Sequence, residues 1–213
     1  MTRFFVLHPV VGSPYETAFE EAVPVRLGDA PQCAKCGLFV GSKPWLPPYR
    51  AIVKGYGQQL GDIAFGVGSS LLVSEPFRRA WEAAELQGLR FAALEELSIR
   101  PAKLAKTSVS FFQVLIEHRD TLIDERRSII ERSESASCEQ CKAGGVLKNI
   151  RGFSIAESTW SGEDIFYAWG LPGTIVVTDR VAQLAERNGL RNVHVTAVED
   201  YVWDPLHRQA VPS

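Results

Sequence analysis

Leu71-Leu72-Val73-Ser74-Glu75-Pro76-Phe77 is the stretch that decides the fold, because it joins an apolar strand directly to the start of a helix. Ser74 is a favourable N-cap, and Glu75 and Pro76 suit the first helical turn. Apolar side chains then recur at helical spacing on one face, at Phe77, Ala80, Trp81 and Ala84. The stretch predicts a strand followed at once by an amphipathic helix, which Gly88 ends.

Short strands are expected on both sides of this helix. Their expected positions are residues 4–7, 50–54, 62–65, 89–94, 109–116, 151–156, 164–168, 174–177 and 193–198. Glu16, Glu20 and Glu21 favour a short helix within residues 9–32, and the charged residues 119–137 are typical of an exposed helix or a connector. Many strands with few helices predict an α+β protein.

The strand and helix motif occurs twice in the chain. Leu71–Glu75 matches Ile175–Asp179, where Thr178 caps the second helix and Asp179 lies in its first turn. Two shorter matches flank these stretches: Gly61-Asp62-Ile63 with Glu163-Asp164-Ile165, and Gly88-Leu89-Arg90 with Gly189-Leu190-Arg191. We therefore expect an internal duplication of one strand–helix–strand unit, with residues 1–118 as the N-terminal half and 119–213 as the C-terminal half. Chance matching of short apolar runs is the alternative.

All four cysteines of the chain lie in two CxxC pairs, one in each expected half. The pairs are Cys33-Ala34-Lys35-Cys36 and Cys138-Glu139-Gln140-Cys141. Two residues between cysteines let both sulfurs reach one ion, and zinc takes four tetrahedral thiolate ligands. The spacing predicts one structural Zn²⁺ per chain, bound by Cys33, Cys36, Cys138 and Cys141, which bridges the two halves.

Three other uses of the cysteines remain open. A redox CxxC normally precedes a helix, which lowers the thiol pKa, whereas Gly37 and a proline-rich loop follow Cys36. Disulfides would require an exported protein. An iron–sulfur cluster can also use four cysteines.

No catalytic motif is recognisable, so we expect a protein that is not an enzyme. The histidines His8, His118, His194 and His207 form no motif with a cysteine, serine or carboxylate. His194 is expected to be a half-exposed strand residue. Asp62 and Asp164 occupy matching places and are expected at turns or strand starts rather than as a catalytic pair.

Four tryptophans fall in or near expected loops, at Trp45, Trp160, Trp169 and Trp203. Such side chains can anchor a protein partner. They can equally cover the edge of a core, which is the expectation here. The acidic Glu199, Asp200 and Asp204 beside Trp203 would suit a basic partner or a solvated face.

Composition and charge favour an ordinary globular protein. Of 213 residues, 46% are hydrophobic, and the formal net charge of -2 argues against a dedicated nucleic-acid binder. The apolar run 4–7 is too short for a signal peptide, and no run suits a membrane span. A cytoplasmic location is therefore expected.

Cys33–Gly37 and Cys138–Cys141, at this separation, resemble the motifs of the myxobacterial double-CXXCG paralogous family, which includes immunity proteins of Sit-type toxin pairs. Gly170-Leu171-Pro172-Gly173 followed by Thr178-Asp179 also fits. Lys142 departs from the pattern, because it stands where the second motif would have glycine. The resemblance implies a zinc-binding protein without enzymatic activity that neutralises a cognate toxin by binding it.

The expected function is thus a non-enzymatic zinc-binding protein that binds a protein partner, as an immunity protein does. No small-molecule substrate and no membrane association are expected. The alternative is a zinc-ribbon-like nucleic-acid-binding or regulatory adaptor, which a basic and aromatic face would favour. A thiol oxidoreductase is a third possibility.

Overall fold

The computed structural model describes residues 2–105, 109–117 and 119–205. The helices are α1 (Glu75–Ala83) and α2 (Asp179–Arg187). The strands are β1 (Phe4–His8), β2 (Thr17–Glu21), β3 (Arg26–Leu27), β4 (Trp45–Leu46), β5 (Arg50–Gly55), β6 (Ile63–Phe65), β7 (Leu71–Ser74), β8 (Leu89–Ala93), β9 (Glu96–Arg100), β10 (Phe111–Ile116), β11 (Ile130–Arg132), β12 (Leu147–Arg151), β13 (Ile165–Tyr167), β14 (Ile175–Thr178), β15 (His194–Ala197) and β16 (Val202–Trp203).

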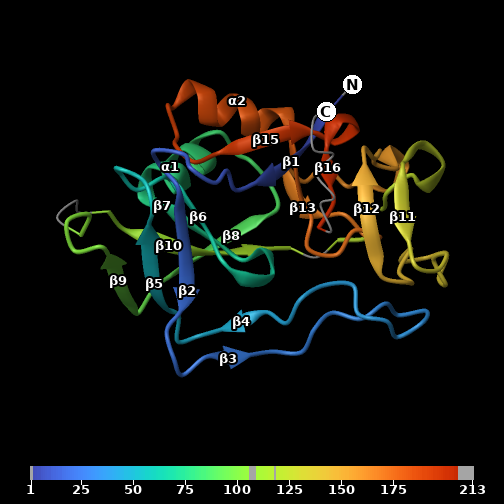
Figure 1. The fold of residues 1–213 in the computed structure, drawn as a ribbon, viewed down its shortest axis with the longest axis horizontal. Coiled ribbons are helices and arrows are strands. Elements are labelled where there is room, and N and C mark those ends of the chain that lie inside the picture. Colours follow the sequence, from blue (N-terminus) through green and yellow to red (C-terminus); the bar gives the residue numbers. More distant parts are fainter. Residues whose placement is uncertain (1, 106–108, 118, 206–213) are drawn as a thin grey trace, which may run out of the picture.

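These elements form a mixed α+β structure, as the sequence predicts (Figure 1). A seven-stranded sheet has the order β8-β10-β7-β6-β2-β5-β9, and a four-stranded sheet has the order β13-β14-β1-β15. The strands β11, β12 and β16 form a third sheet, and β3 pairs with β4 in a long arm on the side opposite α1 and α2. One apolar cluster joins both helices to strands of both large sheets: Leu7, Ile63, Val73, Phe77, Trp81, Ile165, Val177, Val181 and Leu184.

Both helices begin where the sequence places them. Ser74 is the N-cap of α1, and its hydroxyl accepts a hydrogen bond from the Phe77 N–H. Thr178 is the N-cap of α2. Helix α1 ends at Ala83, before Gly88, because Glu85 already adopts a positive φ of 51°.

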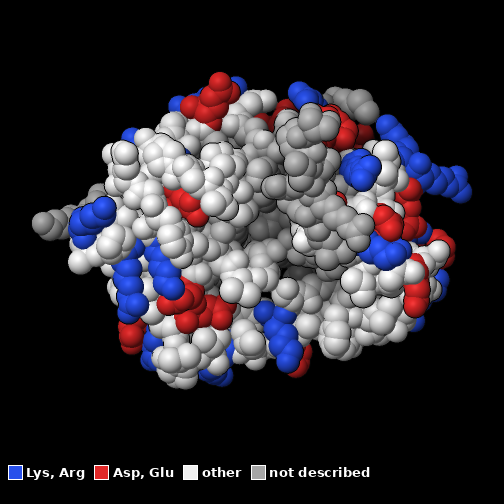
Figure 2. All heavy atoms as spheres, in the orientation of Figure 1, with Lys and Arg blue, Asp and Glu red and all other residues white. Residues whose placement is uncertain are grey.

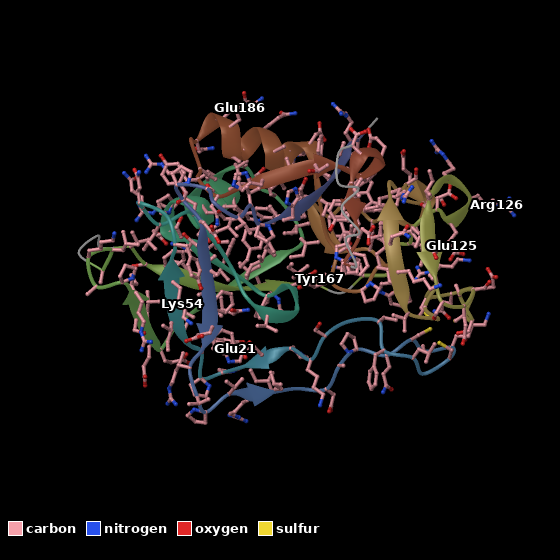
Figure 3. All side chains as sticks on the ribbon, viewed as in Figure 1. Glu21, Lys54, Glu125, Arg126, Tyr167 and Glu186 are labelled. Atoms are coloured by element: carbon pink, nitrogen blue, oxygen red, sulfur yellow. The ribbon has the colours of Figure 1, made fainter. Side chains whose placement is uncertain are left out.

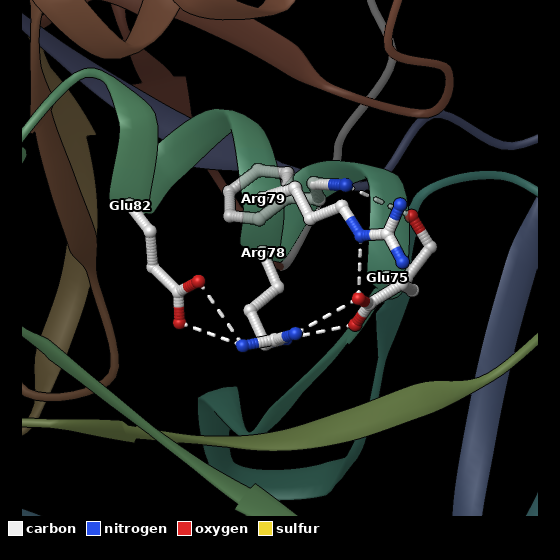
Figure 4. Close-up of polar contacts among 6 residues, drawn as sticks. Glu75, Arg78, Arg79 and Glu82 are labelled. Atoms are coloured by element: carbon white, nitrogen blue, oxygen red, sulfur yellow. Dashed lines mark hydrogen bonds and ion pairs between the residues drawn. The ribbon is translucent and has the colours of Figure 1, made fainter.

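The exposed side of α1 carries a network of ion pairs (Figure 4). Glu75 bonds Arg78 at 2.8 Å and Arg79 at 2.7 Å, and Arg78 also bonds Glu82 at 2.8 Å. The hydrogen bonds from Arg78 and then Arg79 lower the pKa of Glu75 to about 2. An ionised Glu75 at the helix start also complements the helix dipole, so the network stabilises α1 rather than forming a reactive site.

Two sequence expectations are wrong, and a third is decided between its two alternatives. Residues 17–21 form the strand β2 instead of a helix, since Thr17 and Phe19 alternate with less buried residues towards the sheet. Residues 119–137 form a connector and not an exposed helix, since they contain a 3₁₀ turn (Glu125–Arg127), β11 and isolated bridges at Leu122 and Ile123 among those described. Strand β12 ends at Arg151, because Gly152 has a φ of 85° and lies against the Glu199 backbone, so 151–156 is not a strand.

The strands β6-β7-β10-β8 and β13-β14-β1-β15 have the same order and the same pairing. Phe111 of β10 pairs with the N-cap Ser74, and Phe4 of β1 pairs with the N-cap Thr178. The Glu75 N–H donates to Ser110, and the Asp179 N–H donates to Arg3. Strand β1 therefore occupies in the second sheet the place that β10 occupies in the first.

Two aspartates make matching bonds to the loop after the opposite helix. The Asp62 carboxylate accepts from the Ser74 hydroxyl and from the Arg191 N–H at 2.7 Å. The Asp164 carboxylate accepts from the Thr178 hydroxyl at 2.7 Å and from the Gln87 N–H at 2.9 Å. Each aspartate thus ties its own hairpin and helix to the other unit.

These bonds also correct the alignment of the loops that follow the helices. Gln87 and Arg191 are equivalent, because the backbone N–H of each donates to one of the two aspartates. Two residues earlier in each loop, Glu85 (φ 51°) and Gly189 (φ 60°) are equivalent and share a positive φ. The sequence match of Gly88 with Gly189 is therefore displaced by three residues. A duplication event, and a division of the chain between residues 118 and 119, stay predictions, and β1 lies in the sheet of the opposite half.

Candidate metal centre

The first cysteine pair lies at the tip of the arm that extends beyond β3 and β4. The chain turns at Cys33–Gly37, where the Gly37 N–H donates to the Cys33 carbonyl at 2.9 Å and the Cys33 N–H donates to Leu38 at 2.9 Å. Gly37 has a φ of 73°, which L side chains rarely adopt. This tight turn directs both thiols to the same side of the loop, towards the second pair.

The second pair forms the same turn although its sequence lacks the glycine. The Lys142 N–H donates to the Cys138 carbonyl at 2.9 Å, and Lys142 has a φ of 54°. The Lys142 ammonium group lies 2.6 Å from Glu139 and 3.6 Å from Glu125. These ion pairs hold the side chain while its backbone occupies the left-handed conformation. The turn therefore keeps its shape with lysine in place of glycine.

The four cysteine sulfurs meet in one cluster between the arm tip and the second half of the chain (Figure 3). All lie within 4.8 Å of one another, with 4.0 Å between Cys33 and Cys138 and 3.7 Å between Cys36 and Cys141. A disulfide would need about 2.05 Å. Tetrahedral Zn–S bonds of about 2.3 Å place sulfurs roughly 3.8 Å apart. The four thiols therefore fit a single metal ion and form no disulfide.

The cluster is largely closed to solvent. Cys33, Cys138 and Cys141 are buried among Val40, Trp169 and neighbouring apolar side chains, and Cys36 is exposed. Hydrogen bonds from the backbone N–H groups of Cys141 and Gln140 lower the pKa of Cys138 to about 6, whereas burial raises the pKa of Cys141 to about 12. Burial favours the protonated thiols, and a bound cation would displace their protons and stabilise the thiolates. Four protein thiolates would leave it no open position, so such an ion would serve structure.

Neither cysteine pair begins an α-helix. The arm tip continues towards β4, and the second turn continues towards β12. A helix N-terminus, which activates a redox thiol, is therefore missing at both described pairs. The geometry favours a metal centre over a dithiol redox site.

Gly37→Ala should destabilise the protein by about 1 kcal/mol, because a Cβ favours other values of φ. Space is not the cause, since no heavy atom lies within 4 Å of the position that the alanine Cβ would take. Urea unfolding measures the change, and elemental analysis should find the metal content unaltered. An unchanged unfolding free energy would contradict the strained turn.

The histidines form no cluster with the cysteines among the described residues. His8 and His194 face each other across β1 and β15, and the His8 Nε2 lies 2.9 Å from the Thr196 hydroxyl. Burial and then the nearby His8 lower the pKa of His194. His194 is a half-buried strand residue, as expected. His118 and His207 lie outside the described residues.

The tryptophans cover core edges, as the sequence favours. Trp45 and Trp169 are buried, and Trp160 packs edge-on against Phe4 at 5.3 Å between ring centroids. Trp203 lies in β16 against the same cluster as Phe4. Trp169 covers the cysteine sulfurs, a role that the sequence does not reveal because Trp169 belongs to a different segment from either CxxC pair.

No protein-family model matches the chain, and no curated protein shows significant similarity to it. Within the described ranges, neither helix is long and apolar enough to cross a membrane.

Proposed function

We propose that the chain is a non-enzymatic protein-binding module whose shape depends on one structural Zn²⁺ held by Cys33, Cys36, Cys138 and Cys141. The observation that carries the metal assignment is the convergence of four thiols from two turns 105 residues apart. Four soft thiolates with tetrahedral spacing suit zinc. The reduced thiols also suit a cytoplasmic protein.

The zinc would cross-link the arm to the second half of the chain. The arm from β3 to β4 has only a two-stranded ladder of its own, with Arg26 opposite Leu46 and Leu27 opposite Trp45. Such a ladder is marginal in water without further packing. Trp45 packs the base of the arm against Phe19 of the seven-stranded sheet, and a metal at the tip would attach the far end of the arm to the second half of the chain.

The two equivalent sheets support a duplication with exchanged first strands. In this account each repeat begins with its own Phe-Phe strand, β1 or β10, followed by a CxxC turn, a hairpin and a capped helix. Each first strand then completes the sheet of the other repeat. A shared metal and exchanged strands would together hold the repeats in one fixed arrangement.

Exposed apolar side chains near the metal support protein binding. Phe39 is 63% exposed at the arm tip, beside Leu38, and Val146 is exposed after the second turn. Aromatic side chains of this kind serve as anchors in interfaces. Acidic and basic side chains are interspersed on the face in Figure 2, an arrangement that does not favour the nucleic-acid adaptor.

The resemblance to the double-CXXCG family directs the proposal to immunity, with a toxin as the partner. The mechanism would be occlusion of a toxin surface by binding. A net charge of -2 suits a mildly basic toxin.

Co-expression with the product of the adjacent gene tests this function. We expect rescue of growth and a complex that co-purifies with the full-length protein. Phe39→Ala should weaken capture roughly tenfold, as loss of an interface anchor does. Val202→Ala, at an exposed site in β16, should not. Growth arrest without any complex would contradict the proposal, and salt-sensitive binding to nucleic acid alone would favour the adaptor.

A further inference from the structure

A cleft of about 730 Å³ lies between the arm and the seven-stranded sheet. The arm contributes Trp45, β10 of the seven-stranded sheet contributes Gln113 and Leu115, and β13 of the four-stranded sheet contributes Tyr167. The face in Figure 2 is hollowed near its middle, and Figure 3 shows Glu21 by the base of the arm and Tyr167 above its middle. A volume of this size matches ligand pockets in proteins, which are commonly about 300–1,000 Å³.

Gln113, which lines this cleft, carries an unsatisfied acceptor. The residue is only 4% exposed, and its Nε2 donates to the Val114 carbonyl at 2.9 Å. That bond determines the orientation of the amide, because the opposite orientation would place two oxygens together. The Oε1 atom is buried with no hydrogen-bond partner among the described residues. A buried acceptor without a donor costs about 1–3 kcal/mol.

The equivalent residue of the other sheet shows that the fold does not require this amide. Gln113 of β10 pairs with Leu72, and Val6 of β1 pairs with Val176 in the same register. Val6 is 2% exposed and apolar. The apolar side chain of Val6 therefore fills this position in one sheet. In the other sheet the same position holds a buried amide with an unpaired acceptor, in a residue that lines a cleft. Such a local exception points to a function.

The charged groups around the cleft indicate which kind of hydrogen-bond donor a ligand would bring to Gln113. Glu21 lines it, has a pKa raised by burial and forms no ion pair with any described residue. Lys43, Arg90, Arg119 and Glu117 also line it. Glu117 pairs with Arg90 at 3.8 Å and with Arg119 at 2.8 Å, so the lining charges largely offset one another and favour an uncharged ligand. An uncharged N–H group meets the need of Gln113 in these surroundings. The apolar side chains of Trp45 and Leu115 suit an apolar or aromatic body next to the N–H group.

We propose that this cleft binds an uncharged amide carried on an apolar or aromatic group, with the amide N–H donating to the Gln113 Oε1. The amide can belong to a peptide segment or to a free small molecule. This site is separate from the metal centre, and its existence does not depend on an immunity function.

The test uses the full-length metal-loaded protein and phenylacetamide, followed by NMR of the Gln113 side-chain amide. We expect saturable binding with a dissociation constant on the order of millimolar, as suits a ligand of this size. N,N-Dimethylphenylacetamide, which has no N–H, should bind about tenfold more weakly. A blocked Gly-Phe-Gly peptide binding more tightly than phenylacetamide would identify a peptide source, and weaker binding would identify a small molecule.

Gln113→Val supplies the matched variant, because Val6 holds the equivalent place. It should fold with unchanged metal content and should bind the two phenylacetamides equally, as followed by ligand-observed NMR. Glu186→Gln, on α2, should behave as the unaltered protein. The proposal is overturned if phenylacetamide does not bind, or if the unaltered protein binds both compounds equally, because the Gln113 Oε1 would then take no part in binding.

Discussion

Cys141→Ser should abolish metal binding and lower the thermal midpoint of unfolding by roughly 10 °C or more. Cys141 is completely buried, and its thiol is the one for which burial most opposes a free thiolate. Structural zinc sites contribute folding free energy directly, and a loss of about 3–5 kcal/mol corresponds to such a shift for a chain of this size. Calorimetry together with elemental analysis measures both effects.

Lys35→Ala is the matched control for this prediction. Lys35 lies between Cys33 and Cys36, is exposed and offers no sulfur. The variant should keep its metal and its thermal midpoint. A Cys141→Ser protein that unfolds at the same temperature as the unaltered protein would show that the cluster contributes nothing to stability.

Asp164→Ala should cost about 3–5 kcal/mol, the second largest effect that we expect. The Asp164 side chain is almost fully buried and accepts from the Thr178 hydroxyl, the Gln87 N–H and, at 3.0 Å, Arg180. Its removal leaves buried donors unpaired, which is strongly destabilising. Urea unfolding at constant metal content measures the difference.

Asp62→Ala provides the comparison, because Asp62 makes the equivalent bonds at a more exposed position. It accepts from Ser74 and Arg191 and has no arginine side chain bound to it among the described residues. We expect a smaller loss, about 1–2 kcal/mol. If Asp164→Ala cost no more than Asp62→Ala, the cross-bonds would not be the source of the stability that we assign to them.

The cysteine cluster and both helix starts were predictable from local chemistry. CxxC spacing limits which sulfurs can meet at one ion, and Ser74 and Thr178 mark helix starts by satisfying free backbone N–H groups. These features need only a few neighbouring residues. The convergence of Cys33 and Cys36 with Cys138 and Cys141 could then be predicted from the four ligands that a zinc ion would take, without knowledge of the intervening fold.

The exchange of β1 and β10 could not be predicted in the same way. Pairing of β1 with β14 depends on register between residues about 170 positions apart, and an apolar run such as Phe4–Leu7 suits any central strand equally well. The displaced match of Gly88 with Gly189 has a similar cause, since Glu85 adopts a backbone conformation that sequence assigns to glycine. Tertiary contacts decide both features.

The role of Gln113 lies between these cases. A polar residue inside the apolar run Phe111–Ile116 is visible in the sequence as an exception. Its meaning emerges only when the structure places Val6 at the equivalent position and a cleft beside the amide.

Elemental analysis of the purified, folded protein tests the central claim most directly. The account predicts about one zinc per chain, with the four thiols protected from thiol reagents until a chelator removes the metal. A folded protein that contains no metal and four freely reactive thiols would contradict it.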